Sequence, residues 1–170
     1  MINFEKELDG DDLRSIGNAN KIVSLVRDQS SFDQLFRLLF HAKRQIVMRA
    51  ADAIEKITIQ HPEYLTPYKK ELFEISLHDN KIELKWHLAQ LLPRIEFNKA
   101  EKRKAWEILF EWANNKNESK IVRVNALQGL DILLPTMTEQ KQELIDLVAS
   151  IYKENIPSIN ARIRKLRNVQ

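Results

Sequence analysis

The chain contains Ala50-Ala51-Asp52-Ala53-Ile54-Glu55-Lys56-Ile57, and at intervals of 38 residues the pattern returns as Leu88-Ala89-Gln90-Leu91-Leu92-Pro93-Arg94-Ile95 and Ala126-Leu127-Gln128-Gly129-Leu130-Asp131-Ile132-Leu133. The first, fifth and eighth positions of each segment are aliphatic. This i, i+4, i+7 spacing places them on one face of a helix. Ala53, Leu91 and Gly129 join that face, and small residues there allow a neighbouring helix to approach closely. The three segments therefore predict a repeated, buried helix.

Further amphipathic segments lie between and around these three. The sequence predicts helices near 11–27, 32–41, 43–60, 67–78, 81–95, 99–114, 120–134, 139–154 and 159–168, the first with a break at Gly17-Asn18. Capping-box spacing occurs at Ser31-Phe32-Asp33-Gln34 and at Asn98-Lys99-Ala100-Glu101. Pro93 lies inside a predicted helix, where it is expected to kink the helix or shorten its last turn.

A helix pair of this length, whose second helix follows the pattern basic-x-x-Ala/Leu-x-x-x-Leu, resembles a HEAT repeat of the armadillo-like α-solenoid class. Met48-Arg49-Ala50-Ala51-Asp52-Ala53-Ile54 and Val122-Arg123-Val124-Asn125-Ala126-Leu127 carry the resemblance. It implies an all-α fold, a right-handed α-α superhelix of about four helix pairs. The expected organisation is a single domain over 1–170, with clear repeats at about 31–134 and flanking cap helices at 1–30 and 135–170.

Composition excludes several classes of site. There is no cysteine, so disulfides, thiolate nucleophiles and zinc-thiolate clusters are impossible. The four histidines form no i, i+4 pair of the kind that presents two metal ligands from one helix, and the glycines are isolated, so no phosphate loop is present. The first residues lack the pattern of a secretory signal, and no apolar run approaches the length of a membrane span. We expect a cytoplasmic, non-enzymatic protein without cofactor, metal or membrane partner.

One polar stripe recurs on a second face of the repeated helices. It consists of Arg49, Asp52 and Lys56, then His87, Gln90 and Arg94, then Asn125 and Gln128. The HEAT resemblance implies that second helices line the concave binding surface, so these residues form a candidate binding ladder. Because its cations outnumber Asp52, it favours a protein partner with an acidic segment. The alternative is a solvated face with no partner.

The net charge of +3 arises at the carboxyl end. Four of the positive charges are carried by Arg162, Arg164, Lys165 and Arg167, so the net charge of residues 1–161 is −1. These cations either belong to a polar end-cap or contact nucleic acid. DNA-alkylation-repair glycosylases also use a HEAT-like solenoid, and Arg49, Asp52, Lys56, Trp86 and Arg94 loosely resemble their basic surface with aromatic and acidic residues. Nucleic-acid binding is therefore the alternative to protein binding.

Overall fold

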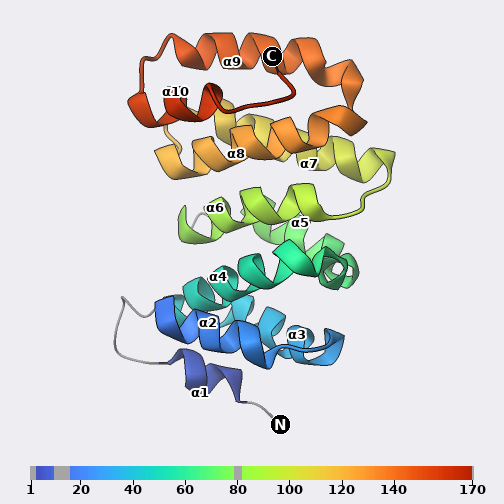
Figure 1. Cartoon of the computed structure of the whole chain (residues 1–170), viewed down its shortest axis with the longest axis vertical. Coiled ribbons are helices and arrows are strands. Elements are labelled where there is room, and N and C mark those ends of the chain that lie inside the picture. The colour runs from blue at the N-terminus through green and yellow to red at the C-terminus, as the bar shows by residue number, and fades with distance from the viewer. Residues whose placement is uncertain (1–2, 10–15, 79–81, 170) are drawn as a thin grey trace. The chain divides into compact units, whose positions relative to one another are not determined.

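The computed structural model describes residues 3–9, 16–78 and 82–169, and every regular element among them is a helix (Figure 1). The chain divides into two compact units, Met1–Lys69 and Lys70–Gln170. The prediction of a single domain over 1–170 is not tested by this division. No helix among the described residues is long and apolar enough to cross a membrane.

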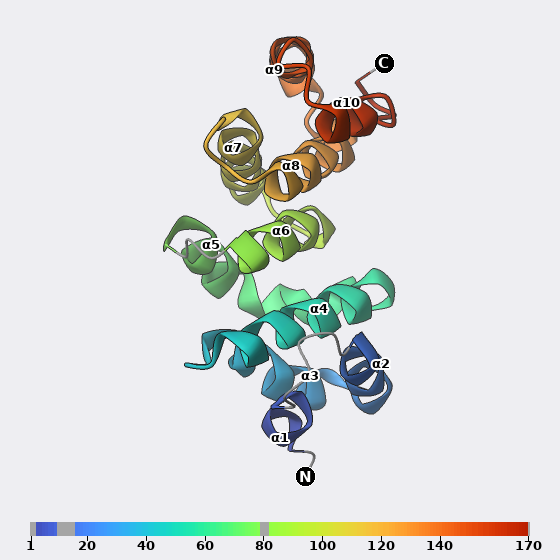
Figure 2. The same cartoon turned by 90° about the vertical axis from the view of Figure 1, so that its left-hand side faces the viewer.

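The first unit is built around one long helix. Its elements are α1 (Phe4–Leu8), α2 (Ile16–Leu25), α3 (Gln29–Phe36), the 3-10 helix η1 (Arg37–Phe40), α4 (Arg44–Gln60) and the 3-10 helix η2 (Pro62–Tyr68). Helices α1, α2 and α3 all pack against α4 (Figure 2). Phe32 and Leu35 of α3 and Ile46 and Ile54 of α4 are fully buried, so the apolar stripes meet in this core.

The second unit contains three successive helix pairs. Its elements are α5 (Lys69–His78), α6 (Ile82–Leu91), η3 (Leu92–Arg94), α7 (Lys99–Asn114), α8 (Lys120–Leu133), η4 (Leu134–Thr136), η5 (Thr138–Gln140), α9 (Lys141–Tyr152) and α10 (Pro157–Ile163). Helix α8 packs on its own partner α7 and on α6 and α10, the second helices of the neighbouring pairs. This stacking of helix pairs confirms the predicted all-α, HEAT-like superhelical fold class.

The aliphatic stripe is buried as predicted. Its described members are at most 5% exposed: Ala50, Ile54, Ile57, Leu88, Leu92, Ile95, Ala126, Leu130 and Leu133. Gly129 shows why a small residue is needed in α8. A Cβ at this position would lie 2.9 Å from the carbonyl oxygen of Ala89 and 3.0 Å from the Leu109 side chain. The missing side chain therefore allows α8 to lie close to α6 and α7.

Several predicted boundaries need correction. Helix α3 begins at Gln29 because Asp28, and not Ser31, is its N-cap; Ser31 is the third residue of the helix and completes the capping box. Helix α2 continues through positions 17 and 18 without the expected break. The capping box at Asn98 and Glu101 is confirmed. Helix α6 ends at Leu91, and the turn that contains Pro93 is the 3-10 helix η3, so the expected shortening of the helix at this proline is also confirmed.

Candidate partner-binding face

The stripe residues of α4 already have partners inside the first unit. Lys56 Nζ lies 2.8 Å from Asp52 Oδ2 in an i, i+4 ion pair, and both side chains are 30% exposed. The same ammonium lies 3.3 Å from the Asn20 side-chain oxygen of α2. The pairing with Asp52 neutralises one of the two cations that the sequence places in this part of the stripe.

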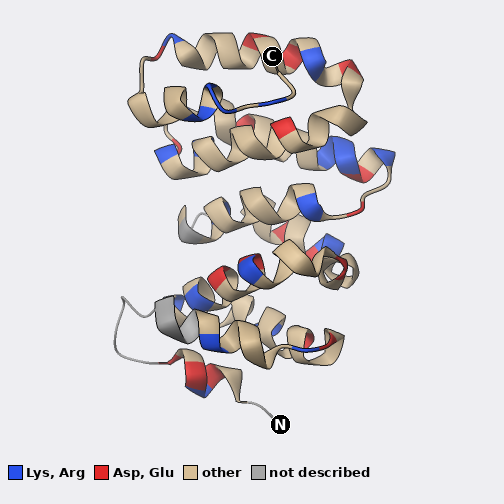
Figure 3. Cartoon of the chain, viewed as in Figure 1, with Lys and Arg blue, Asp and Glu red and all other residues tan. Residues whose placement is uncertain are grey.

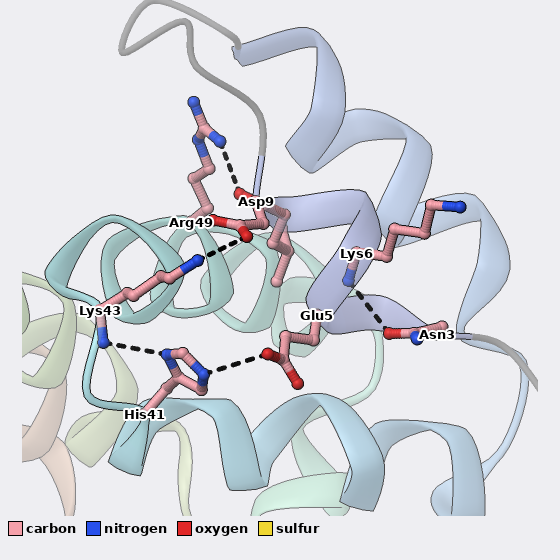
Figure 4. Close-up of polar contacts among 8 residues, drawn as sticks. Asn3, Glu5, Lys6, Asp9, His41, Lys43 and Arg49 are labelled. Atoms are coloured by element: carbon pink, nitrogen blue, oxygen red, sulfur yellow. Dashed lines mark hydrogen bonds and ion pairs between the residues drawn. The ribbon is translucent and has the colours of Figure 1, made fainter.

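Arg49 departs from the expectation of an open surface residue. It is only 8% exposed, and its guanidinium donates to the carbonyl oxygen of Leu8, the last residue of α1 (Figure 4). A carbonyl in the last turn of a helix has no partner within the helix, and an arginine can supply one. Arg49 is therefore covered because α1, which the sequence analysis did not predict, packs over it.

The second-helix face of the second unit is more open, with one exception. His87 is 2% exposed and stacks on Trp86 with a centroid distance of 3.6 Å, so it belongs to the packed interior. Four other predicted residues are partly exposed: Gln90, Arg94, Asn125 and Gln128. Arg162 of α10 donates to the side-chain oxygen of Gln128 over 2.8 Å. A cation assigned by sequence to the basic tail thus joins the face of α8.

The segment after α10 is fastened to α8 by a buried carboxylate that the sequence analysis did not single out. Asp131 is 2% exposed and accepts hydrogen bonds from the backbone N–H groups of Arg167 at 3.1 Å and Asn168 at 2.8 Å. The Asn168 side chain donates to the Asp131 carbonyl oxygen over 2.8 Å. Leu166 is 2% exposed. Helix α10 therefore ends at Ile163, earlier than predicted, because the following residues adopt an irregular path that Asp131 stabilises.

Three basic residues of this segment are exposed, Arg164, Lys165 and Arg167, and the chain after α10 is accordingly blue in Figure 3. None of the three forms an ion pair with a described residue. The docked Leu166 agrees with a structural end-cap. The charged groups nevertheless remain available to an anionic partner.

We expect Asp131→Ala to lower the free energy of unfolding by about 1–3 kcal/mol, because the partly buried backbone N–H groups of Arg167 and Asn168 lose their acceptor. Asp146→Ala on the exposed side of α9 provides the control and is expected to change stability by about 0.5 kcal/mol or less. Urea unfolding of the two variants measures the difference. Equal effects would show that Asp131 does not hold the end of the chain.

Two ion pairs connect successive repeats in the second unit. Lys85 of α6 lies 2.8 Å from Glu118, which follows α7, and Arg123 of α8 forms a bidentate pair of 2.7 and 2.9 Å with Glu154, which follows α9. Lys85 and Arg123 are 38 residues apart, so each cation occupies the same place in its repeat. Hydrogen bonding to Arg123 lowers the pKa of Glu154 below the ordinary value of a glutamate.

The histidines do not assemble a metal site in the part of the chain that the structure describes, where no group of three or more potential ligands was found. His41 and His61 each contact one glutamate, at 3.4 and 3.0 Å respectively. Trp106 and Trp112 are buried, while Trp86 is partly exposed. These positions give no arrangement of nucleophile, base and orienting group of the kind that acyl or glycosyl transfer needs.

Comparison with known proteins agrees with the stacked helix pairs. A family model described as a HEAT repeat domain matches residues 4–167, which span nearly all of the described helices. No curated protein and no solved structure matches the chain.

Proposed function

Because this chain belongs to the HEAT repeat domain family, we propose that it is a non-enzymatic protein-binding or adaptor module. The binding surface is the second-helix face of the second unit, made up of Gln90, Arg94, Asn125, Gln128 and Arg162. Stacked helix pairs present a continuous row of side chains from successive repeats, and such rows commonly bind other proteins.

The observation that carries this proposal is the composition of that face. Its polar side chains are partly exposed on helices that pack side by side, and none of them is an acid. Ile132 is 49% exposed one turn after Gln128, so an apolar contact accompanies the cations. Arginine offers bidentate hydrogen bonds to carboxylates. A partner segment with acidic residues and one apolar anchor complements these groups.

The test is a charge reversal in the second unit, Arg94→Glu combined with Arg162→Glu. Affinity capture from a native extract at two salt concentrations, with nuclease-treated controls, first identifies the protein partner. We expect the double variant to bind that partner at least about tenfold more weakly, since loss of interfacial charge pairs costs several kcal/mol. Lys141→Glu at the start of α9 combined with Lys153→Glu just after its end makes the same change of charge at exposed positions and is the matched control. Equal affinity of the two double variants would contradict the proposal.

Nucleic-acid binding is the second candidate, and the exposed Arg164, Lys165 and Arg167 favour it. Phosphate contacts release counterions, so the affinity for a DNA or RNA duplex would fall steeply with salt. Replacing the three cations by glutamine abolishes such binding while leaving Arg94 in place. If the affinity capture recovers nucleic acid, and nuclease treatment removes every captured protein, the result would favour this candidate over protein binding.

A further inference from the structure

Helix α1 is an acidic amphipathic segment that lies in a basic recess of the first unit. Its apolar residues Phe4 and Leu8 are 3% and 0% exposed. The acidic residues Glu5, Glu7 and Asp9 occupy the positions between and after them. The segment therefore presents two apolar anchors on one side and a row of carboxylates beside them.

Each of these carboxylates faces a basic group from another element of the unit. Asp9 lies 2.6 Å from Lys43 Nζ, Glu7 lies 2.7 Å from Lys21 Nζ, and Glu5 lies 3.4 Å from His41 Nε2. Arg49 adds a fourth contact through the Leu8 carbonyl oxygen. Figure 4 shows His41 and Lys43 directed toward α1, and Arg49 beside the end of α1 at Asp9. We call Lys21, His41, Lys43 and Arg49 the basic recess.

His41 is itself held in place for this contact. Its Nδ1 accepts a hydrogen bond from the backbone N–H of Lys43 at 3.0 Å, which leaves Nε2 to face Glu5. The basic recess thus places nitrogen donors around α1, whose Phe4 and Leu8 side chains are buried. Its complement is a short helix whose acidic residues surround two apolar side chains separated by one turn.

We propose that the basic recess is a docking site for a short acidic amphipathic helix of a protein partner, and that α1 occupies it within the chain. The inference rests on the proposed function only in that the ligand is again a protein; the residues of the basic recess lie in the first unit, outside the second-unit binding surface. A partner helix has to displace α1, so the acidic segment that the sequence analysis expected as a partner has an internal counterpart. Docking of α1 then sets how much of Arg49 a partner can reach.

The test uses a fluorescent peptide of sequence Asn3–Asp9 and the full-length chain. In the wild type the tethered α1 competes at an effective concentration in the millimolar range. Glu5→Lys with Asp9→Lys weakens the internal docking at two exposed side chains, and Leu8→Ser weakens it through the apolar contact. We expect each opened variant to bind the peptide at least about tenfold more tightly than the wild type, measured by fluorescence anisotropy at low salt.

The recess is then changed in the opened chain. Adding Lys43→Glu to the Glu5→Lys/Asp9→Lys variant is expected to abolish peptide binding, whereas Arg37→Glu at an exposed position of η1 leaves it unchanged. The proposal would be overturned if neither opened variant bound the peptide, or if Lys43→Glu left the affinity for the peptide unchanged. A wild-type dimer that the peptide dissociates would show that a second copy supplies the helix, and would also overturn it.

The outcome is separable from that of the proposed function. The peptide assay involves only first-unit residues, while the Arg94 and Arg162 reversal concerns the second unit alone. If the opened chain binds the peptide, and the Arg94→Glu/Arg162→Glu variant still captures the partner as the wild type does, the second-unit face is refuted and the basic recess is supported. The opposite pair of results would refute the recess alone.

Discussion

Arg123→Ala is expected to lower the free energy of unfolding by about 3–5 kcal/mol, as is usual when one partner of a buried ion pair is removed. Arg123 is 2% exposed, and its guanidinium makes three contacts: two with the Glu154 carboxylate and one of 2.9 Å from Nε to the Ala113 carbonyl oxygen. The variant leaves the Glu154 carboxylate, which is 14% exposed, without its cation. Loss of the hydrogen bond to Ala113 weakens the contact of α8 with α7, and loss of the pair with Glu154 weakens its contact with the residues that follow α9.

Tryptophan fluorescence during urea unfolding measures this change, because all three tryptophans, Trp86, Trp106 and Trp112, lie in the second unit. The matched control is Arg103→Ala, which removes a surface i, i+4 pair with Glu107 whose two side chains are 50% and 59% exposed. We expect this control to leave the free energy of unfolding nearly unchanged, because exposed ion pairs contribute little to stability. Similar costs for the two arginines would mean that the buried pair contributes no more than a surface pair.

The same ion pair predicts a dependence on pH. The pKa of Glu154 is lower in the folded chain than in the unfolded chain because Arg123 stabilises its charged form. The contribution of this ion pair to the free energy of unfolding is therefore fully present above the pKa of an unfolded glutamate, about 4.3. It is lost as the pH falls through the lower pKa of the folded state. The stability difference between wild type and Glu154→Gln should accordingly shrink as the solution is acidified below that value. A difference that grows with acid would contradict this sign.

The buried helices could be predicted because their signal is local. Aliphatic residues such as Ile54, Leu92 and Leu130 recur at helical spacing, and burial of one face follows from that period alone. The short helix α1 has five residues, which is too few for a period to emerge. Its docking depends on contacts with α2 and α4, which begin at Ile16 and Arg44. A contact between separate helices of this kind cannot be predicted from a local sequence pattern.

The candidate site was only partly predictable for the same reason. The spacing of Arg49 and His87 places them beside the apolar stripe, but whether such a border position is open depends on what packs over it. The structure covers Arg49 with α1 and buries His87 against Trp86. The pairs of Lys85 and Arg123 join residues 33 and 31 positions apart. Their equal place in the repeat was a usable signal that the sequence analysis passed over.

Leu92→Ala tests the repeat itself, and we expect it to lower the free energy of unfolding by about 2–5 kcal/mol. Leu92 is fully buried, and Leu88, Leu91 and Leu130 around the same stripe are also 0% exposed. Truncation removes apolar contacts and leaves a cavity that stacked helices fill only in part, because the close packing of α6 and α8 at Gly129 limits their movement.

Ile132→Ala is the matched control, because it removes a similar amount of aliphatic side chain from a position that is 49% exposed on α8. We expect its effect to stay within about 0.5 kcal/mol. Urea unfolding followed by tryptophan fluorescence compares the two variants under one condition. If Ile132→Ala proved as harmful as Leu92→Ala, the apolar stripe and the exposed face would be wrongly distinguished. The apolar contact that we propose at Ile132 beside the binding surface would then have to be abandoned as well, because the side chain would be needed to hold the helices together.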